Sequence, residues 1–433
     1  MTSKRRARPS AGRARLKPLE QTLRSVFNLE TFRPGQEAVI RSVLSGRDTL
    51  AIMPTGAGKS LCYQLPALHL RGMTVVVSPL ISLMKDQADK LGELGVGASQ
   101  INSALTSREE ADPLTGIADE TPDFILTTPE RLADPTFLER FRDKELDLIV
   151  VDEAHCISQW GHDFRPSYLE LAQAITELGR PPVLALTATA AADVQEDIAR
   201  QLGLRDVNVI STGIYRENLR YEVDSVDSED DKHTALARLF AELEGSGIVY
   251  TATVKHAEEL TTFLRSQGHD VERYHGKLKA RERHDTQERF MRGELHALVA
   301  TNAFGMGIDK PDIRFVIHYD MPGTLDAYYQ ESGRAGRDGE PAKCVLLFRR
   351  ADQRTHLFFM AGKYPRFNDI LAVYAALARV GADGQPVPLP EIQGAAADVA
   401  KTKVRVVLAT LKDWKIVKQH RQGGYQVTRS GLA

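Results

Sequence analysis

The 433-residue sequence predicts an α/β protein with two consecutive parallel-sheet domains followed by a small third domain. Short β-branched runs alternate with helical patterns over about residues 19–211 and again over 212–349. This alternation is typical of parallel α/β sheets. After residue 350 the pattern changes to helices, a Gly/Pro-rich linker and a hairpin. The length agrees, since it suggests roughly two to four domains.

The strands of both sheets are expected where apolar, β-branched runs are bounded by turn residues. In the first domain they are 49–53, 74–78, 124–128, 146–151 and 183–187. In the second domain they are 247–251, 271–275, 297–301, 315–319 and 344–348. Between the two blocks, the acidic stretch 224–232 is interpreted as polar surface.

The C-terminal part is expected to form a helical connector over 350–384 and a winged-helix-like domain over 385–433. Val404, Leu408 and Leu411 share one face of a predicted helix, and residues 415–428 read as a hairpin that turns at two glycines. Its basic residues suit duplex DNA: Lys401, Lys403, Arg405, Lys412, Lys415, Lys418, His420 and Arg421. The alternative is a domain that only packs on the rest of the chain.

Composition excludes several classes of protein. No apolar run approaches the roughly 18 residues of a membrane span, and the N-terminus lacks the apolar core of a secretory signal. The three cysteines show no CxxC spacing, which favours a reducing, intracellular location and argues against disulfides or structural zinc. Net charge is −2, yet residues 1–18 are basic without an acid. They are expected to be a disordered tail, which either stays solvated or also contacts phosphates.

The sequence MPTGAGKS, at 53–60, follows an apolar strand and precedes a helical pattern, which is the context of a phosphate-binding P-loop. The strict pattern would have glycine where this chain has Met53. The other elements are present. Gly56 and Gly58 let backbone N–H groups close on phosphates. Thr55 is expected to bind the nucleotide with them. Lys59 should reach the β- and γ-phosphates, and the Ser60 hydroxyl should hold Mg²⁺.

The sequence VVDEAH supplies carboxylates at the end of the fourth expected strand. Doubly wound sheets place their ligands at the carboxyl ends of strands. We expect Asp152 to coordinate Mg²⁺ and Glu153 to orient the attacking water. A pair of surface acids is the alternative, and the preceding P-loop argues against it.

Residues 156–171, just beyond these acids, are rich in rings and cations: Trp160, His162, Phe164, Arg165 and Tyr168. The four-residue spacing of the aromatic rings would also suit one stripe of a buried helix. Gly161 and Pro166 interrupt such a helix, so a loop that presents rings fits better. Aromatic faces stack on unpaired bases at about 1–3 kcal/mol per base. Because the loop follows Asp152 and Glu153 directly in the chain, DNA bound to the loop is expected to change the position of these acids.

Together these segments resemble superfamily-two helicases, along with LTATA at 186–190 and YYQESGRAGRDG at 328–339. The segments 27–40, 76–87 and 300–322 resemble one family within that group, the RecQ DNA helicases. The resemblance covers about residues 19–350. It implies two RecA-like domains, ATP and Mg²⁺ as cofactors, and single-stranded and forked DNA as partners. It further implies ATP-driven 3′-to-5′ translocation with unwinding in DNA repair and recombination. A bacterial member would be cytoplasmic and nucleoid-associated.

The resemblance also assigns roles to residues. Gln36 is expected to pair with the adenine edge, with Phe32 or Arg33 on the ring plane. Asp309 lines the cleft on the second domain. Thr187, Thr189 and His155 link hydrolysis to DNA and domain movement.

Arg334 and Arg337 are expected on one helix face, with Arg337 favoured as the finger that stabilises the γ-phosphate. The alternative is that these arginines pair on the surface with Glu331 or Asp338. Asn28 stands where the family often has glycine, and asparagine tolerates the left-handed turn expected there.

This chain also departs from the family in its cysteines. Many members carry a four-cysteine zinc module after the motor domains, but Cys344 is the last of the three cysteines here, so no zinc is expected. Three alternatives stay open: an RNA helicase, a translocase that does not unwind, and a DNA-binding protein with an inactive ATPase.

Overall fold

The computed structural model describes residues 18–79, 81–101, 124–141, 144–158, 165–305, 310–352, 365–382, 384–420 and 424–428. The basic tail therefore lies outside the described residues, apart from Pro18. The chain divides into two compact units. The first comprises residues 1–155 and 167–216, and the second comprises 156–166 and 217–433.

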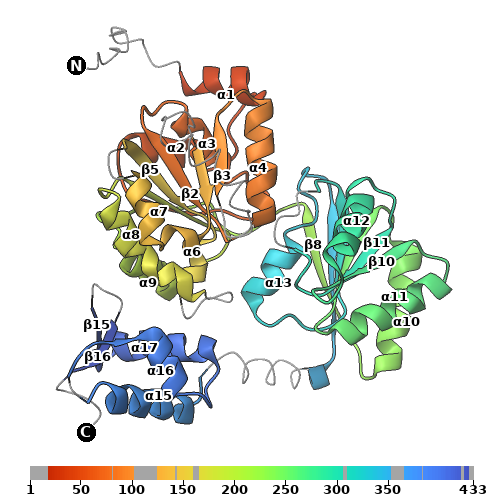
Figure 1. Cartoon of the computed structure of the whole chain (residues 1–433). Coiled ribbons are helices and arrows are strands. Elements are labelled where there is room, and N and C mark those ends of the chain that lie inside the picture. The colour runs from red at the N-terminus through yellow and green to blue at the C-terminus, as the bar shows by residue number, and fades with distance from the viewer. Residues whose placement is uncertain are drawn as a thin grey trace. The chain divides into compact units, whose positions relative to one another are not determined.

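The first unit contains a seven-stranded parallel sheet of order β3-β4-β2-β5-β6-β1-β7 (Figure 1). Its strands are β1 (Thr49–Ile52), β2 (Met73–Val77), β3 (Ala98–Ile101), β4 (Phe124–Thr127), β5 (Leu146–Val151), β6 (Val183–Thr187) and β7 (Asn208–Ser211). All five strands expected from the sequence are present. The two additional strands, β3 and β7, lie at the edges of the sheet, where most of their residues are only half-buried or exposed.

Helices pack on this sheet. They are α1 (Leu19–Phe27), α2 (Gln36–Leu44), α3 (Leu61–Ala67), α4 (Ile81–Glu93), α6 (Pro129–Leu132), α7 (Pro135–Leu138), α8 (Leu171–Glu177) and α9 (Ala192–Gln201). Short 3-10 turns lie at η1 (Glu139–Phe141), η2 (Ala154–Ile157) and η3 (Pro166–Glu170). Asn28 caps α1 with φ 53°, as its residue type predicts.

The second unit contains a six-stranded parallel sheet of order β10-β11-β9-β12-β13-β8. Its strands are β8 (Leu219–Ser225), β9 (Ser246–Tyr250), β10 (Val271–Tyr274), β11 (Ala297–Ala300), β12 (Ile313–His318) and β13 (Ala342–Phe348). The stretch 224–232, interpreted as surface, ends the unexpected strand β8 and begins α10 (Glu229–Glu242) through a capping box between Ser228 and Asp231.

Two separate apolar clusters cover the two faces of this sheet. Leu236 of α10 and Leu260 of α11 (Val254–Ser266) pack with Val249 on one face. Phe290 of α12 (Ala280–Met291) packs with Ile248 on the other. The unit also contains α13 (Leu325–Ser332) and η4 (Arg350–Asp352). Figure 1 shows α13 on the opposite side of the sheet from α10 and α11.

A buried ion network ties α10 to the ends of β12 and β13. The Lys232 amine is fully buried and donates to Tyr319 O at 2.6 Å, Asp352 Oδ2 at 2.5 Å and Asp320 Oδ1 at 3.4 Å. Asp320 also bonds the His256 ring at 2.7 Å. The segment that follows β13 is therefore held by charge as well as by packing.

The small C-terminal domain has the helix–strand–helix–helix–hairpin order of a winged helix. Its elements are α15 (Phe367–Val380), β14 (Val387–Pro388), α16 (Leu389–Ala395), α17 (Lys401–Asp413), β15 (Val417–Gln419) and β16 (Gly424–Val427). The sheet order is β14-β16-β15, antiparallel throughout. Val373 and Leu377 of α15 share a core with Leu408 and Leu411 of α17. The helix α15 therefore packs as part of this domain, although all of it lies in the range 350–384 that was expected to form the connector.

Within the described part of the chain, no helix combines the length and the apolar character needed to cross a bilayer.

Candidate nucleotide and nucleic-acid site

The P-loop connects β1 to α3 in the first unit. Gly56 and Gly58 take φ values of 84° and 75°, which glycine adopts without strain. A Cβ on Gly58 would lie 2.6 Å from Gln36 Nε2, so a larger residue there would displace the Gln36 amide from the P-loop. Met53 stands where the strict pattern has its first glycine. Its side chain is fully buried in the core, and its amide donates to Thr187 O at 3.0 Å. The fold therefore accommodates a methionine at this position.

The residues expected to read adenine hold the P-loop in this structure. Gln36 Nε2 donates to the carbonyls of Ala57 and Gly58, both at 3.0 Å, and its Oε1 accepts from Arg33 N at 2.8 Å. The Arg33 guanidinium donates to Gly56 O. Base recognition by Gln36 stays a prediction, and it would require the amide to leave these carbonyls.

Phe32 is half-buried against the cluster formed by α1, α2 and α3. One side of its ring is therefore committed to packing, whereas Arg33 is exposed. That either residue covers a base plane stays a prediction.

Lys59 and Ser60 end the P-loop. Lys59 Nζ donates to Met53 O at 3.3 Å, so its amine lies over the loop. Ser60 Oγ accepts from Gln87 Nε2 at 3.3 Å, and Gln87 in turn accepts from the Tyr63 hydroxyl at 2.5 Å. The sequence patterns did not single out Gln87, although it is the last residue of the segment 76–87 that resembles the family. Thr55 O accepts from Arg216 Nη1 at 3.5 Å.

Asp152 and Glu153 follow β5. Asp152 is 7% exposed and accepts from Glu153 N at 3.0 Å and from Ser78 Oγ at 3.5 Å. Burial raises the pKa of Asp152 to about 7; the charge of Glu153 adds to the shift and Lys59 opposes it. Glu153 takes φ 49°, a left-handed conformation that a non-glycine residue adopts at a cost of about 1–3 kcal/mol.

A hydrogen-bonded chain links the acids to β6. His155 Nδ1 lies 3.0 Å from Thr187 Oγ1 and 3.5 Å from Glu153 Oε2. The Thr187 hydroxyl donates to Thr189 O at 2.9 Å. Since that hydroxyl has only one proton, it accepts from His155, which places a proton on Nδ1. His155, Thr187 and Thr189 are therefore brought together, all three buried.

The aromatic segment is tied to the same acids. Its residues Trp160, His162 and Phe164 lie outside the described residues. Arg165 is half-buried, and its amide donates to Cys156 O at 2.8 Å, which closes the base of the segment. Tyr168 is fully buried, and its hydroxyl donates to Asp152 O at 3.0 Å.

The grouping of Tyr168 with exposed rings was therefore wrong. Pro166 starts a 3-10 turn that directs Tyr168 inward, where the Asp152 carbonyl satisfies its hydroxyl.

In the second unit, the expectation that Arg334 and Arg337 lie on a helix was wrong. α13 ends at Ser332, Gly333 is its C-cap, and both arginines lie in the turns that follow. Gly336, with φ 57°, cannot continue a helix. The acids considered as their partners bond elsewhere: Asp338 with Arg314 at 2.6 Å and Glu331 with His318 at 2.9 Å.

Arg334 is 5% exposed, and its guanidinium donates to Gly305 O. A Cβ on Gly305 would lie 2.6 Å from Arg334 Nη2, so a larger residue there would displace the guanidinium. Arg337 is half-buried. Asp309 lies outside the described residues.

These residues fit Mg²⁺ and a nucleotide. No cluster of three or more acidic, histidine or cysteine ligands occurs in the described ranges, and Mg²⁺ in nucleotide sites needs none, because phosphates and waters complete its shell. Ser60 and Asp152 supply hard oxygen donors of the required kind. Among the described residues, Glu153 Oε2 is buried and accepts no hydrogen bond, although it lies 3.5 Å from His155 Nδ1.

Two family models match the chain. The DEAD/DEAH box helicase model covers residues 33–198, and the helicase conserved C-terminal domain model covers residues 231–339. The ATP-dependent DNA helicase RecQ of Bacillus subtilis is 45% identical over 346 residues, which are 79% of this chain and 58% of that protein. The probable ATP-dependent DNA helicase RecS of the same organism is 44% identical over 331 residues, 76% of this chain and 66% of that protein.

The chain belongs to the RecQ family. It spans about 58–66% of the length of these two relatives. Among solved structures, the RecQ-family chain resembles Mycobacterium smegmatis Lhr, described as bound to ssDNA and AMP-PNP (TM-score 0.63, 21% identity, 96% of this chain and 61% of that chain). It also resembles Saccharomyces cerevisiae Dbp5, described as bound to RNA and ADP BeF3 (TM-score 0.64, 19% identity, 91% and 98%). At these identities the likeness shows the fold alone.

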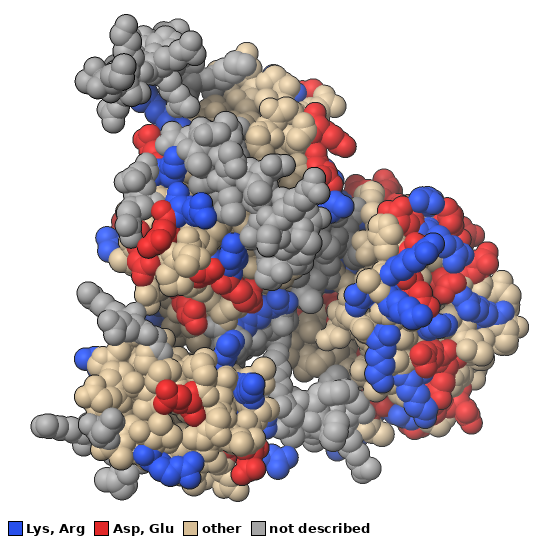
Figure 2. All heavy atoms as spheres, in the orientation of Figure 1, with Lys and Arg blue, Asp and Glu red and all other residues tan. Residues whose placement is uncertain are grey.

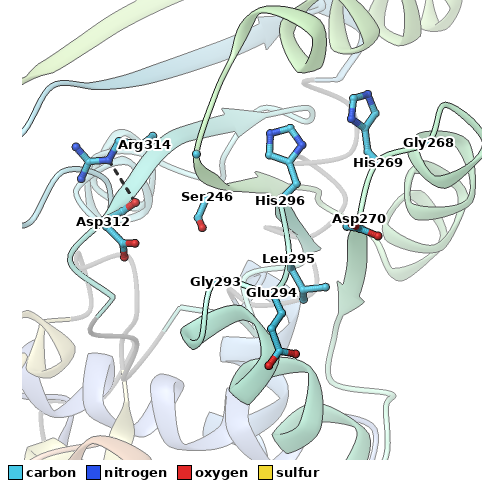
Figure 3. Close-up of a pocket in the computed structure, with 11 residues that line it drawn as sticks. Ser246, Gly268, His269, Asp270, Gly293, Glu294, Leu295, His296, Asp312 and Arg314 are labelled. Carbon is cyan, nitrogen blue, oxygen red and sulfur yellow. Dashed lines mark hydrogen bonds between the residues drawn. The ribbon is translucent and has the colours of Figure 1, made fainter.

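A pocket of about 660 Å³ lies in the second unit of this RecQ-family chain (Figure 3). Its lining includes Ser246, Asp270, His296 and Asp312, which lie at or just before the starts of strands β9 to β12. Ligands of doubly wound sheets bind at the opposite, carboxyl ends. The side chains in Figure 3 point in different directions, so the pocket offers no convergent set of catalytic groups.

Proposed function

We propose that the chain is an ATP-dependent DNA helicase that couples Mg²⁺-ATP hydrolysis to 3′-to-5′ translocation on single-stranded DNA and to unwinding of forked duplexes in repair and recombination. RecQ-family membership and the geometry of the DEAH segment support this proposal.

Hydrolysis would use the residues around the P-loop. Lys59 moves from the Met53 carbonyl to the phosphates, and Gln36 exchanges its P-loop carbonyls for the adenine edge. Glu153 orients water through its buried Oε2. Bound Mg²⁺, held by Ser60 and Asp152, would neutralise the charge that develops on the phosphates. Arg337, with Arg334 as a buried support, would stabilise the same charge from the second domain.

Coupling to DNA would run through the segment 156–168. Unpaired bases stack on Trp160 and Phe164, while Arg165 and His162 meet phosphates. The observation that carries the proposal is the bond from Tyr168 to the carbonyl of Asp152, because it fixes the end of that segment to a residue of the metal site. A shift of the segment therefore reaches Asp152 directly, and through Glu153 it reaches His155 and Thr187.

The winged-helix domain would bind the duplex ahead of the motor. Lys401, Arg405 and Lys412 are exposed and lie four and seven residues apart on α17, so they share one face. Lys403 is excluded from this role because it pairs with Asp369 at 3.1 Å and is largely buried.

The test compares ATP hydrolysis by the wild type and Trp160→Ala with single-stranded DNA, duplex DNA and RNA. We expect strong stimulation of the wild type by single-stranded DNA, and loss of most of that stimulation in the variant while ATP binding survives. Phe367→Ala, which removes a ring that is 70% exposed on α15, serves as the control. Equal stimulation of the wild type and Trp160→Ala would remove the coupling role.

The same assay decides among the alternatives. Stronger stimulation by RNA would indicate an RNA helicase, and no hydrolysis at all would indicate a binding protein. Displacement assays on duplexes with either a 3′ or a 5′ single-stranded tail test the polarity and separate a helicase from a translocase that does not unwind.

A further inference from the structure

Three polar side chains beside the P-loop form a closed ring of hydrogen bonds. The Tyr63 hydroxyl donates to Gln87 Oε1 at 2.5 Å, and Gln87 Nε2 donates to Ser60 Oγ at 3.3 Å. The Tyr63 hydroxyl is also hydrogen-bonded to Ser60. Of the three residues, only Ser60 has a part in the proposed reaction, as a ligand of Mg²⁺.

Tyr63 and Gln87 occupy core positions that packing alone would fill with apolar residues. Tyr63 lies on α3, is 1% exposed and packs edge-on against Phe124, with 6.4 Å between the ring centroids. Gln87 is 8% exposed and lies on α4 between Met84 and Leu91, two members of the apolar cluster around that tyrosine. Since a buried polar group is costly without partners, the hydrogen-bonded ring, and not packing, accounts for the hydroxyl and the amide.

The distances fix the direction of these bonds. A separation of 2.5 Å suits an O–H···O bond better than an N–H···O bond, so the Gln87 oxygen faces Tyr63 and the Gln87 nitrogen faces Ser60. The single proton of Tyr63 is donated to that oxygen, and the phenol therefore accepts from the Ser60 hydroxyl. Each member thus donates one hydrogen bond and accepts one within the ring.

The ring determines what Ser60 can offer to a metal. A serine hydroxyl has one proton and two acceptor lone pairs. Its proton is donated to Tyr63, and one lone pair accepts from Gln87. One lone pair remains for Mg²⁺, and the proton is held away from it. The oxygen is therefore pre-organised as a ligand.

The ring also lies near the second expected ligand of Mg²⁺. Burial raises the pKa of Tyr63, and the charge of Asp152 adds to the shift. The phenol therefore stays protonated at neutral pH and keeps its bond to Gln87. It also lies within the electrostatic reach of Asp152.

We propose that Tyr63 and Gln87 are positioning residues for Mg²⁺, which hold the Ser60 hydroxyl in the orientation that binds the metal and thereby set the metal affinity of the site. Mutation of a partner that orients a metal ligand typically lowers metal affinity by about 10–100-fold. The inference rests on the proposed function only in taking Ser60 as a ligand of Mg²⁺.

The test uses the full chain and a non-hydrolysable ATP analogue, with binding measured by calorimetry. Tyr63→Phe keeps the aromatic ring and removes only the hydroxyl. It should weaken binding of Mg²⁺ to the complex of protein and analogue by at least about tenfold. Affinity for the analogue in EDTA should not change, because Ser60 is the one P-loop residue to which these side chains bond. Tyr319→Phe, which removes a buried phenol bond in the other unit, should change neither affinity.

Two further variants test whether the effect passes through Ser60. Gln87→Met matches glutamine in length and lacks the amide, so it should reproduce the loss of Mg²⁺ affinity. Ser60→Ala removes the ligand itself. Because the ring acts through that ligand, adding Tyr63→Phe to Ser60→Ala should weaken Mg²⁺ binding no further.

Three results would overturn the proposal. They are an unchanged Mg²⁺ affinity in Tyr63→Phe and Gln87→Met, an equal loss of analogue affinity with Mg²⁺ and in EDTA, and a further loss of Mg²⁺ affinity when Tyr63→Phe is added to Ser60→Ala. Each would leave the ring as a structural tie between α3 and α4. Analogue binding in EDTA also shows that the variants are folded.

Failure of this inference is distinguishable from failure of the proposed function, because metal binding is measured without hydrolysis and without DNA. A wild type that binds Mg²⁺ with the analogue but is not stimulated by single-stranded DNA would refute the proposed function and leave the inference intact. A wild type that binds the analogue equally well with Mg²⁺ and in EDTA would refute both the metal role of Ser60 and its positioning by the ring.

Discussion

At the scale of single residues, the buried carboxyl of Asp152 makes the site sensitive to pH. Burial raises its pKa to about 7, and only the ionised form binds a metal. We therefore expect the apparent Mg²⁺ affinity, measured with a non-hydrolysable ATP analogue, to fall by up to about tenfold per unit of pH below 7. Asp152→Asn should bind Mg²⁺ weakly at every pH. A metal affinity in the wild type that is constant between acidic and basic pH would contradict this account.

The same shift affects the stability of the nucleotide-free protein. A carboxyl whose pKa is raised in the folded state stabilises the fold only while it is protonated, so its contribution is lost as pH rises from about 4 through 7. Asp152→Asn keeps a neutral group at every pH. We expect it to raise Tm by about 3 °C at pH 8 and to leave Tm unchanged at pH 4, as measured by calorimetry. Equal effects at both pH values would count against a buried charge.

At the scale of secondary-structure elements, the Lys232 network should contribute strongly to the second unit. Removal of the amine by Lys232→Met leaves Asp320 and Asp352 buried with fewer partners, which costs about 3–5 kcal/mol for a broken buried pair. Urea unfolding should show this loss. Lys255→Met, which removes an exposed i,i+4 pair with Glu259, should cost less than about 0.5 kcal/mol. Similar losses in the two variants would mean that the network is not a buried anchor.

Sequence patterns predicted the central elements well because those elements are buried. All ten expected strands are present, and nine of them carry apolar runs; the exception is β10 (Val271–Tyr274), an edge strand of which only Val271 is buried. The unpredicted strands β3, β7 and β8 are edge strands, whose solvent-facing residues weaken the apolar signal. The end of α13 was missed since Gly333 and Gly336 were read only as parts of a motif.

Within the site, sequence patterns gave the types of residues but not their present partners. The P-loop and DEAH positions follow from spacing, and the structure brings His155, Thr187 and Thr189 together. The inward turn of Tyr168 could not be predicted, because it depends on a carbonyl sixteen residues earlier in the chain. The Gln87 contact with Ser60 likewise depends on how α4 packs.

At the scale of the whole molecule, a net charge of −2 and interspersed surface charges (Figure 2) leave DNA binding to a few local sites. Of the DNA contacts proposed above, those of the segment 156–168 would be the ones bonded to the candidate nucleotide site, through Tyr168. The central claim is that DNA on this segment controls hydrolysis through that bond.

The most direct measurement is therefore the DNA-stimulated ATPase rate of Tyr168→Phe, which keeps the ring and removes only the hydroxyl that bonds Asp152. Tyr319→Phe is the matched control, because it removes a buried phenol bond to Glu229 in the other unit. The account predicts that Tyr168→Phe binds ATP and single-stranded DNA normally but loses most of its stimulation, at least about tenfold, whereas Tyr319→Phe keeps it. Full stimulation in Tyr168→Phe would contradict the account.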